Sequence, residues 1–239
     1  MRGLFPTRAR ARDAILRGTV TVDGRAIDRP AAAVAADAAI GTTDPAVRYV
    51  SRAALKLLHA LDHFGYDPAG RLALDIGAST GGFTEVLLER GASRVVAFDV
   101  GHGQLDPAIA ADPRVTAIEG LNARDLEGRH VGGAPAAIVS DVSFISQRLA
   151  LPPALGLAAP GCFAVVLVKP QFEVGREGIG KGGLVRDPVA GIAAAEAFAA
   201  WFGRQSGWAV DGLIPSPITG GSGAAEFLLG GRRLPQAAG

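Results

Sequence analysis

The stretch LDIGASTGGFTEVLLERGASRVVAFDV, residues 74–100, contains a strand, a glycine-rich turn, a helix and a second strand in succession. An apolar run over residues 72–76 leads into a turn with glycine at positions 77, 81 and 82, and residues 83–90 favour a helix. A second apolar run over residues 95–100 carries Asp99. Elements in this order form one half of a doubly wound nucleotide-binding fold.

The turn is a poor match to a dinucleotide site, which needs glycine at its first, third and sixth positions. Positions 77, 79 and 82 read Gly, Ser and Gly. Asp75 would repel a pyrophosphate and suits a cationic ligand, while Asp99 can bond a ribose diol. S-adenosylmethionine, with its sulfonium and amino group, fits these charges. The alternative is that the glycines only allow close packing within a βαβ unit.

Composition indicates a globular cytoplasmic protein. Of 239 residues, 49% are hydrophobic, which is ample for a packed core, and the formal net charge of +1 restricts any nucleic-acid surface to a local patch. The single cysteine, Cys162, excludes internal disulfides and fits a reducing compartment. Residues 155–168 form the longest apolar stretch, which is too short to span a membrane, and the basic N-terminus has no apolar signal core.

The first 44 residues differ from the rest in charge and pattern. They read as an arginine-rich helix capped by Thr7, then a strand, a tight VDGR turn and another strand. The helix arginines could neutralise phosphates, or they could form a solvated face. We expect a small basic α+β module over residues 1–44, a linker over 45–50, a main domain over 51–234 and a tail over 235–239.

The main domain alternates strands with helices. Helices are expected over residues 51–64, 83–90 and 189–205, and strands over 72–75, 95–99, 115–118, 136–141, 163–169, 209–214 and 226–229. This pattern predicts an α/β fold built on a seven-stranded, doubly wound sheet.

Three of these strands bring titratable side chains to the edge of the sheet where ligands bind. Asp141 ends one strand in SDVSF, Lys169 ends the next in LVKPQFE, and Glu226 opens the last. A lysine in an apolar strand is costly unless it is paired, so Lys169 is either functional or held in a salt bridge. Asp141 could instead cap a helix, and Glu226 alone is a weaker candidate.

A glycine-rich charged loop covers residues 170–188. Its basic residues, Arg176, Lys181 and Arg186, could touch phosphates as the loop closes over a substrate, or the loop could be plain surface. His59 and His63 share one helix face without a supporting acid cluster, so no metal site is expected.

Taken together, the motifs YVSRAALKL, LDIGASTGGFTEVLLERGA, DVGHGQLD, NAR, SDVSFIS and LVKPQFEVGRE resemble the TlyA-type rRNA 2'-O-methyltransferases, also called haemolysin A-like proteins. The likeness spans nearly the whole chain, and the main domain resembles the FtsJ-type RNA ribose methyltransferases with a Rossmann-like sheet. The N-terminal module is similar to an alpha-L RNA-binding domain. Such a module usually opens with a further helix, and here either the true start lies upstream or the module is trimmed.

The resemblance implies a catalytic tetrad of Lys56, Asp141, Lys169 and Glu226. A ribose hydroxyl is a poor nucleophile, so methyl transfer gains from a base and from in-line alignment. Lys169 is our choice for the base, since burial and a second lysine nearby would favour its neutral form. Asp141 would orient Lys169, while Lys56 and Glu226 would position the ribose.

The resemblance also implies binding residues. The predicted cofactor site consists of Asp75, Gly77, Ser79, Thr80, Gly81, Gly82, Phe83, Asp99 and Asn122, with Asp99 at the cofactor ribose. The predicted RNA contacts are Arg8, Arg10, Arg12, Arg17, Arg48, Arg52, Arg176 and Lys181. His102, Gly120, Leu121, Ala224 and Ala225 depart from the family pattern and leave the RNA target open.

The sequence thus predicts S-adenosylmethionine-dependent methylation of a ribose 2'-hydroxyl in 16S or 23S ribosomal RNA, at cytidine. One alternative is a methyltransferase acting on a small metabolite, against which the basic loop and helix argue. Another is an RNA-binding assembly factor without turnover, against which the tetrad argues. A membrane-damaging haemolysin lacks support because the sequence offers no spanning or signal segment.

Overall fold

The computed structural model describes residues 3–220 and 223–235, so most of the predicted tail lies outside the described residues. The chain forms two compact units, Met1–Tyr49 and Val50–Gly239. The division falls within the linker predicted over residues 45–50.

The first unit combines one helix with a three-stranded sheet. Helix α1 (Arg8–Leu16) begins after Thr7, whose hydroxyl accepts a hydrogen bond from the backbone N–H of Arg10. Strands β1 (Val20–Val22) and β2 (Arg25–Ile27) form a hairpin through Asp23 and Gly24, both at positive φ. Strand β3 (Ile40–Thr42) pairs with the other side of β1. This third strand was not expected, because only three residues interrupt an Ala-rich stretch. A short 3₁₀ helix, η1 (Pro45–Arg48), follows.

The second unit contains the predicted seven-stranded sheet, in the order β6-β5-β4-β7-β8-β10-β9. Strands β6, β5, β4, β7 and β8 are parallel, and β10 runs antiparallel to both of its neighbours. The chain therefore winds outward from β4 in both directions, which confirms the doubly wound prediction. The bounds are β4 (Leu72–Ile76), β5 (Arg94–Asp99), β6 (Val115–Glu119), β7 (Ala137–Ser140), β8 (Phe163–Val168), β9 (Trp208–Pro215) and β10 (Phe227–Arg233).

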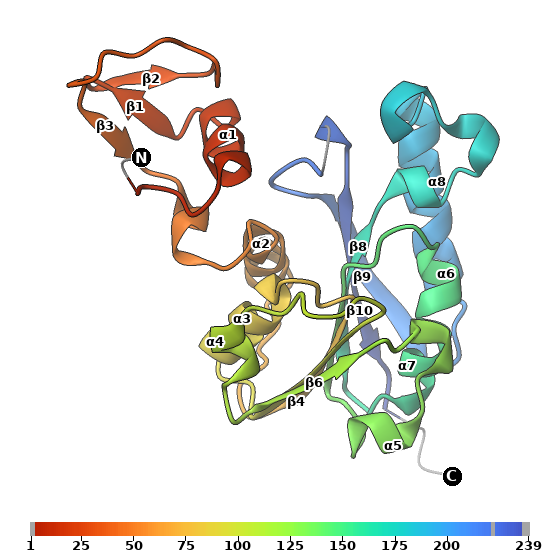
Figure 1. The fold of residues 1–239 in the computed structure, drawn as a ribbon. Helices are drawn as coiled ribbons and strands as arrows, with labels where there is room; N and C mark the ends of the chain where they lie inside the picture. The colour runs from red at the N-terminus through yellow and green to blue at the C-terminus, as the bar shows by residue number, and fades with distance from the viewer. Residues whose placement is uncertain (1–2, 221–222, 236–239) are drawn as a thin grey trace. The chain divides into compact units, whose positions relative to one another are not determined.

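Helices cover both faces of this sheet (Figure 1). One face carries α2 (Ala54–Phe64), α3 (Gly82–Glu89) and α4 (Pro107–Ala110). The other carries α5 (Gly128–Val131), α6 (Gln147–Ala150), α7 (Pro152–Leu157) and α8 (Pro188–Phe202). Short 3₁₀ turns occupy the connections: η2 (Ala123–Asp125), η3 (Pro170–Phe172), η4 (Arg176–Gly178) and η5 (Lys181–Gly183).

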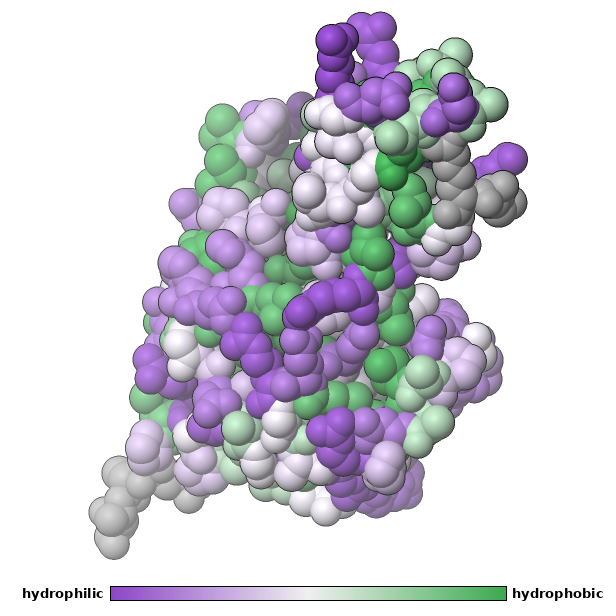
Figure 2. Space-filling view, turned by 90° about the vertical axis from the view of Figure 1, so that its left-hand side faces the viewer, coloured by the Kyte–Doolittle hydropathy of each residue, from purple (hydrophilic) through white to green (hydrophobic). Residues whose placement is uncertain are grey.

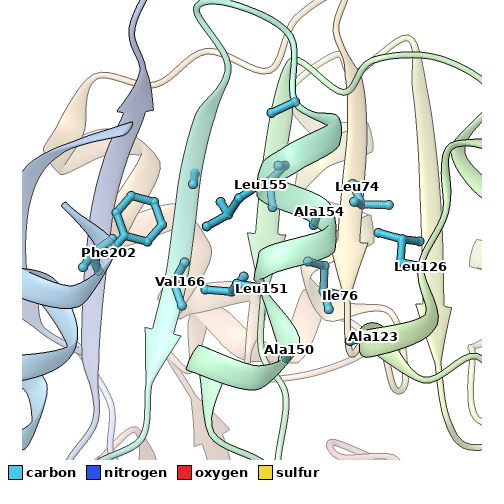
Figure 3. Close-up of a cluster of buried hydrophobic side chains, with 14 of the residues drawn as sticks. Leu74, Ile76, Ala123, Leu126, Ala150, Leu151, Ala154, Leu155, Val166 and Phe202 are labelled. Atoms are coloured by element: carbon cyan, nitrogen blue, oxygen red, sulfur yellow. The ribbon is translucent and has the colours of Figure 1, made fainter. Parts of the chain in front are cut away.

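The larger core lies between the sheet and the second helix layer (Figure 3). Strand residues Ile76 and Val166 are fully buried there beneath Leu151 and Leu155, which belong to the α6–α7 segment. Strand β8 is buried at every position and has no polar residue, as expected for a strand covered on both faces. This apolar centre holds the polar carboxyl edge in place.

The surface is mixed in character. Figure 2 shows hydrophilic side chains spread over the visible face, with hydrophobic ones scattered among them, which is usual for a folded domain. None of the helices within residues 3–220 and 223–235 has both the length and the apolar character that a membrane crossing requires.

Candidate active site

Two adjoining cavities open at the carboxyl edge of the parallel strands, where the fold class places ligands. The larger has a volume of about 750 Å³ and lies over the ends of β4, β5 and β7. The smaller, of about 140 Å³, lies between the glycine-rich turn and Lys169. Four residues line both cavities: Gly77, Ser79, Asp141 and Ser143.

The glycine-rich turn needs its glycines for conformation as well as for space. Gly77 has φ +79°, and a Cβ there would come within 3.1 Å of the backbone oxygen of Asp141. Gly81 has φ +95°, and a Cβ would clash with Leu105. Close packing therefore accounts for part of the pattern, as one alternative held. The same close approach brings the turn against the residues that line the smaller cavity.

Asp99 and Asn122 lie along the larger cavity. The carboxylate of Asp99 accepts hydrogen bonds from the backbone N–H groups of Ser79 and Gly101, each at 2.9 Å. These contacts fix the carboxylate at the end of β5, where each oxygen keeps a further lone pair for a ligand. The side-chain oxygen of Asn122 accepts from the backbone N–H of Arg124 at 3.0 Å. Both positions suit a ligand with ribose hydroxyls.

Asp75 is fully buried beneath the turn and lines neither cavity. Its Oδ2 accepts a hydrogen bond from the hydroxyl of Thr84 at 2.6 Å, whereas Oδ1 has no partner among the described residues. Burial, followed by the negative charges of Asp141 and Asp99, raises the pKa of Asp75 to about 7, although the Thr84 bond opposes the rise. The negative charges of Asp141 and Asp99 thus act on the region around Asp75, which favours a cationic ligand.

We expect the stability of the protein to depend on pH through Asp75. In the folded state the carboxyl group of Asp75 stays protonated until the pH approaches its pKa of about 7. The unfolded chain releases this proton near pH 4, so stability falls as pH rises from about 4 to about 7. Asp75→Asn has no titrating group at this position, so the fall in stability with rising pH should disappear. In denaturant titrations the stability of the variant relative to wild type should rise by about 3 kcal/mol between pH 5 and pH 8. An equal difference at both pH values would contradict the assigned titration.

The four predicted tetrad residues form two ion pairs. The Nζ of Lys169 lies 2.6 Å from Oδ1 of Asp141 and also donates to the hydroxyl of Ser143 at 2.7 Å. Lys56, on α2, pairs with Glu226, and both side chains are almost fully buried. Lys169 and Asp141 line the smaller cavity, whereas the buried Lys56 and Glu226 do not.

The antiparallel direction of β10 explains how Glu226 reaches this edge. Phe227 pairs with Val168 in the β10–β8 register, so Glu226 and Lys169 fall at neighbouring positions one step further along. The start of an antiparallel strand therefore lies beside the ends of the parallel ones. Gly220 leaves room for the carboxylate, because a Cβ at that position would clash with Glu226.

Comparison with known proteins identifies the family. The model for FtsJ-like methyltransferases matches residues 49–233. The chain belongs to the FtsJ-like methyltransferase family. It is 45% identical over 229 residues to the 16S/23S rRNA (cytidine-2'-O)-methyltransferase TlyA of Mycobacterium tuberculosis, covering 95% of this chain and 85% of that protein.

Two further relatives extend the likeness. Hemolysin A of Brachyspira hyodysenteriae is 42% identical over 188 residues, covering 78% of each chain. A solved structure of a protein described as a hemolysin from Streptococcus thermophilus matches with a TM-score of 0.77 and 39% identity, over 98% of this chain and 85% of that one. The family resemblance is thus confirmed, and with it a methyltransferase that uses S-adenosylmethionine.

The methyltransferase has basic residues in two different settings. Arg8 and Arg12 on α1 are exposed, as are Arg176 and Lys181 on the loop after β8. Arg10 and Arg17 instead serve the first unit: Arg10 donates to the backbone oxygens of Ala46 and Tyr49, and Arg17 pairs with Asp44. Arg48 donates to the Tyr49 hydroxyl, and Arg52 is half-buried.

Sequence reasoning did not single out several residues that the structure brings to the site. Thr84 bonds Asp75, Ser143 bonds Lys169, and Glu173 accepts from Ser146 and from the backbone of Gln147. Of these residues, only Ser143 could have been proposed from the sequence. It follows Asp141 by two residues and so can lie on the same side of the loop. In the described part of the chain, no group of three His, Cys, Asp or Glu residues could hold a metal.

Proposed function

We propose that this methyltransferase transfers a methyl group to the ribose 2'-hydroxyl of a cytidine in ribosomal RNA. The observation that carries the proposal is the Lys169–Asp141 pair at the wall of a cavity that adjoins the cofactor cleft. The M. tuberculosis relative, 45% identical, is named for this reaction in 16S and 23S rRNA. A ribosomal substrate would place the enzyme in the cytoplasm.

The cleft residues fit S-adenosylmethionine. Asp99 and Asn122 would bind the ribose hydroxyls, and Gly77 and Ser79 would border the methionine end next to the smaller cavity. The negative charges of Asp141 and Asp99 near the unpaired Oδ1 of Asp75 favour a cation. When bound, the cofactor supplies an electrophilic methyl group on its sulfonium.

The chain's own residues would prepare the nucleophile. With its amine in the neutral form, Lys169 removes or steers the proton of the 2'-hydroxyl as that oxygen is alkylated, and the ammonium that results pairs with Asp141 at the cavity wall. The buried Lys56–Glu226 pair supports the neighbouring strand end and helps to position the ribose. In this arrangement Asp141 and Lys169 contact the reacting region directly, and the second pair completes the charge network.

Binding of the RNA would rest on local basic patches, since the net charge is only +1. Arg8 and Arg12 on α1, and Arg176 and Lys181 on the loop, are exposed and can contact phosphates. Arg10, Arg17, Arg48 and Arg52 stay among the predicted RNA contacts, although intramolecular contacts occupy the first three. A small-molecule substrate would need none of these patches.

Phe144 is positioned to hold the target base. Its side chain is 92% exposed at the wall of the larger cavity, and its φ of +66° is a strained conformation for a non-glycine residue. Its ring rests against Phe172 with centroids 5.6 Å apart. An exposed aromatic ring on a strained backbone is suited to stacking on a nucleobase that is flipped out of the RNA helix.

We therefore expect Phe144→Ala to weaken the interaction with RNA by about ten- to a hundredfold, the value of one stacked base. The loss of RNA affinity should exceed any loss of cofactor affinity, although Phe144 also lines the larger cavity. Titration of ribosomal subunits with each variant, beside calorimetry with S-adenosylmethionine, measures both effects. Phe144→Tyr keeps an aromatic ring and should bind as wild type does. An alanine variant with wild-type RNA affinity would exclude the stacking role.

The proposed reaction is tested by offering labelled S-adenosylmethionine with unmodified small and large ribosomal subunits, and with a mixture of small metabolites. Label in ribosomal RNA, mapped to a cytidine, is the expected result. Label in a metabolite but in neither subunit would identify a small-molecule methyltransferase. Subunit binding without any transfer would indicate an assembly factor.

A further inference from the structure

The hydroxyl of Ser143 makes the directional contact to Lys169. The lysine Nζ donates to this hydroxyl at 2.7 Å. Oδ1 of Asp141 lies at 2.6 Å, but it has no partner with hydrogen-bond geometry among the described residues. Asp141 thus places a negative charge beside the nitrogen, whereas Ser143 accepts the hydrogen bond that fixes the direction of one N–H. Hydrogen bonds weaken steeply when they are bent, so the hydroxyl restricts rotation of the lysine terminus more strongly than the carboxylate does.

The position of Ser143 joins the two cavities. It lines both the larger and the smaller cavity, and its side chain is exposed even though it bonds a largely buried lysine. The lysine nitrogen is tetrahedral and has three positions beyond its carbon. Ser143 occupies one of them in hydrogen-bond geometry, and the charge of Asp141 lies beside the nitrogen. A group that enters the smaller cavity can reach a remaining position, because Lys169 also lines that cavity.

The loop that carries Ser143 is held at both ends. At its start, the backbone N–H of Asp141 bonds the carbonyl of Ile76 at 3.0 Å. At its end, buried Gln147 accepts from the hydroxyl of Ser140 and donates to the carbonyl of Leu167, so it ties β7 to β8. Glu173 adds a third anchor through Ser146. A tethered loop gives Ser143 a fixed direction, as a positioning contact requires.

We propose that Ser143 is a positioning residue for the base. It fixes the Nζ of Lys169 so that the nitrogen faces the ribose hydroxyl in the smaller cavity. This inference rests on the proposed 2'-O-methylation. Because misplacing a reacting group by a small distance slows a reaction without weakening binding, the effect of Ser143 belongs in the rate of the chemical step.

The test compares two serines of the same loop. Ser143→Ala should lower kcat about ten- to a hundredfold, with KM for the ribosomal subunit and cofactor affinity within about twofold of wild type. Ser143→Thr keeps the hydroxyl and should recover most of the rate. Ser146→Ala is the matched control. Ser146 caps α6 and bonds Glu173, so its loss should lower stability by about 1 kcal/mol with a smaller effect on kcat.

A second readout needs no RNA. The rate at which a small amine-reactive reagent labels Lys169, measured by mass spectrometry, should rise in Ser143→Ala and stay near the wild-type value in Ser143→Thr and Ser146→Ala. If wild type fails to methylate ribosomal RNA but labelling still rises, the proposed function fails and the contact stands. Unchanged labelling in Ser143→Ala, or a loss of kcat no larger than that of Ser146→Ala, would overturn the proposal.

Discussion

Lys169→Ala should reduce methyl transfer to ribosomal RNA by at least a hundredfold and leave the affinity for S-adenosylmethionine nearly unchanged. Removing a general base costs about 10²- to 10⁴-fold in rate, and Lys169 borders only the smaller cavity, not the larger one that would hold most of the cofactor. Single-turnover transfer and calorimetry on the same protein give the two quantities. An alanine variant that kept more than about a tenth of the rate would contradict the assignment of the base.

Lys169→Arg separates two roles of the lysine. A guanidinium keeps the positive charge beside Asp141 but does not release its proton in proteins. If Lys169 accepts the proton, the arginine variant should be as slow as the alanine variant. Recovery of most of the rate by arginine would show that the charge alone is required, and the base would then have to be sought elsewhere.

Glu226→Ala should destabilise the protein by about 3–5 kcal/mol, because it leaves the Lys56 ammonium buried without its partner. Lys56 is 5% exposed and Glu226 is 6% exposed, so water can replace little of the lost interaction. Chemical denaturation measures the loss. A change below about 1 kcal/mol, typical of a surface pair, would show that the pair is solvated.

The double replacement Lys56→Met with Glu226→Leu is the control for this pair. Apolar residues of similar volume often restore the stability lost with a buried ion pair. We expect the double variant to fold nearly as stably as wild type and still to transfer methyl groups slowly, since neither charge remains to position the ribose. A double variant with full activity would restrict the pair to a structural role.

The fold was largely predictable from hydrophobic patterning. Strand β8 is a continuous apolar run, and the run through Asp75 to Asp99 shows one complete strand–helix–strand unit. The helix expected over residues 189–205 begins one residue after the start of α8, which Asp187 caps, and ends three residues beyond it. Strand β3 was missed because three residues carry too little pattern. The antiparallel direction of β10 was not predicted, since direction depends on long-range pairing with β8.

The sequence indicated residues that lie together at the candidate site, but it did not indicate how they pair. The strand ends identified Asp141 and Lys169, because a charged group at the end of a buried strand needs a reason to be there. Which residue pairs with which depends on the register between β8 and β10 and on the loop after β7. For the same reason the sequence could not tell that Arg10 and Arg17 bond their own unit while Arg8 and Arg12 face solvent.

The most direct test of the central claim is the chemical position of the transferred methyl group. Ribosomal RNA labelled by the wild-type enzyme is digested to nucleosides and analysed by mass spectrometry, and a parallel sample is hydrolysed in alkali. A methyl group on the 2'-oxygen should appear on the ribose of cytidine and should block alkaline cleavage at that nucleotide, with no signal from Lys169→Ala. A methyl group on a base, with normal alkaline cleavage, would contradict the account of how the lysine and the two cavities work together.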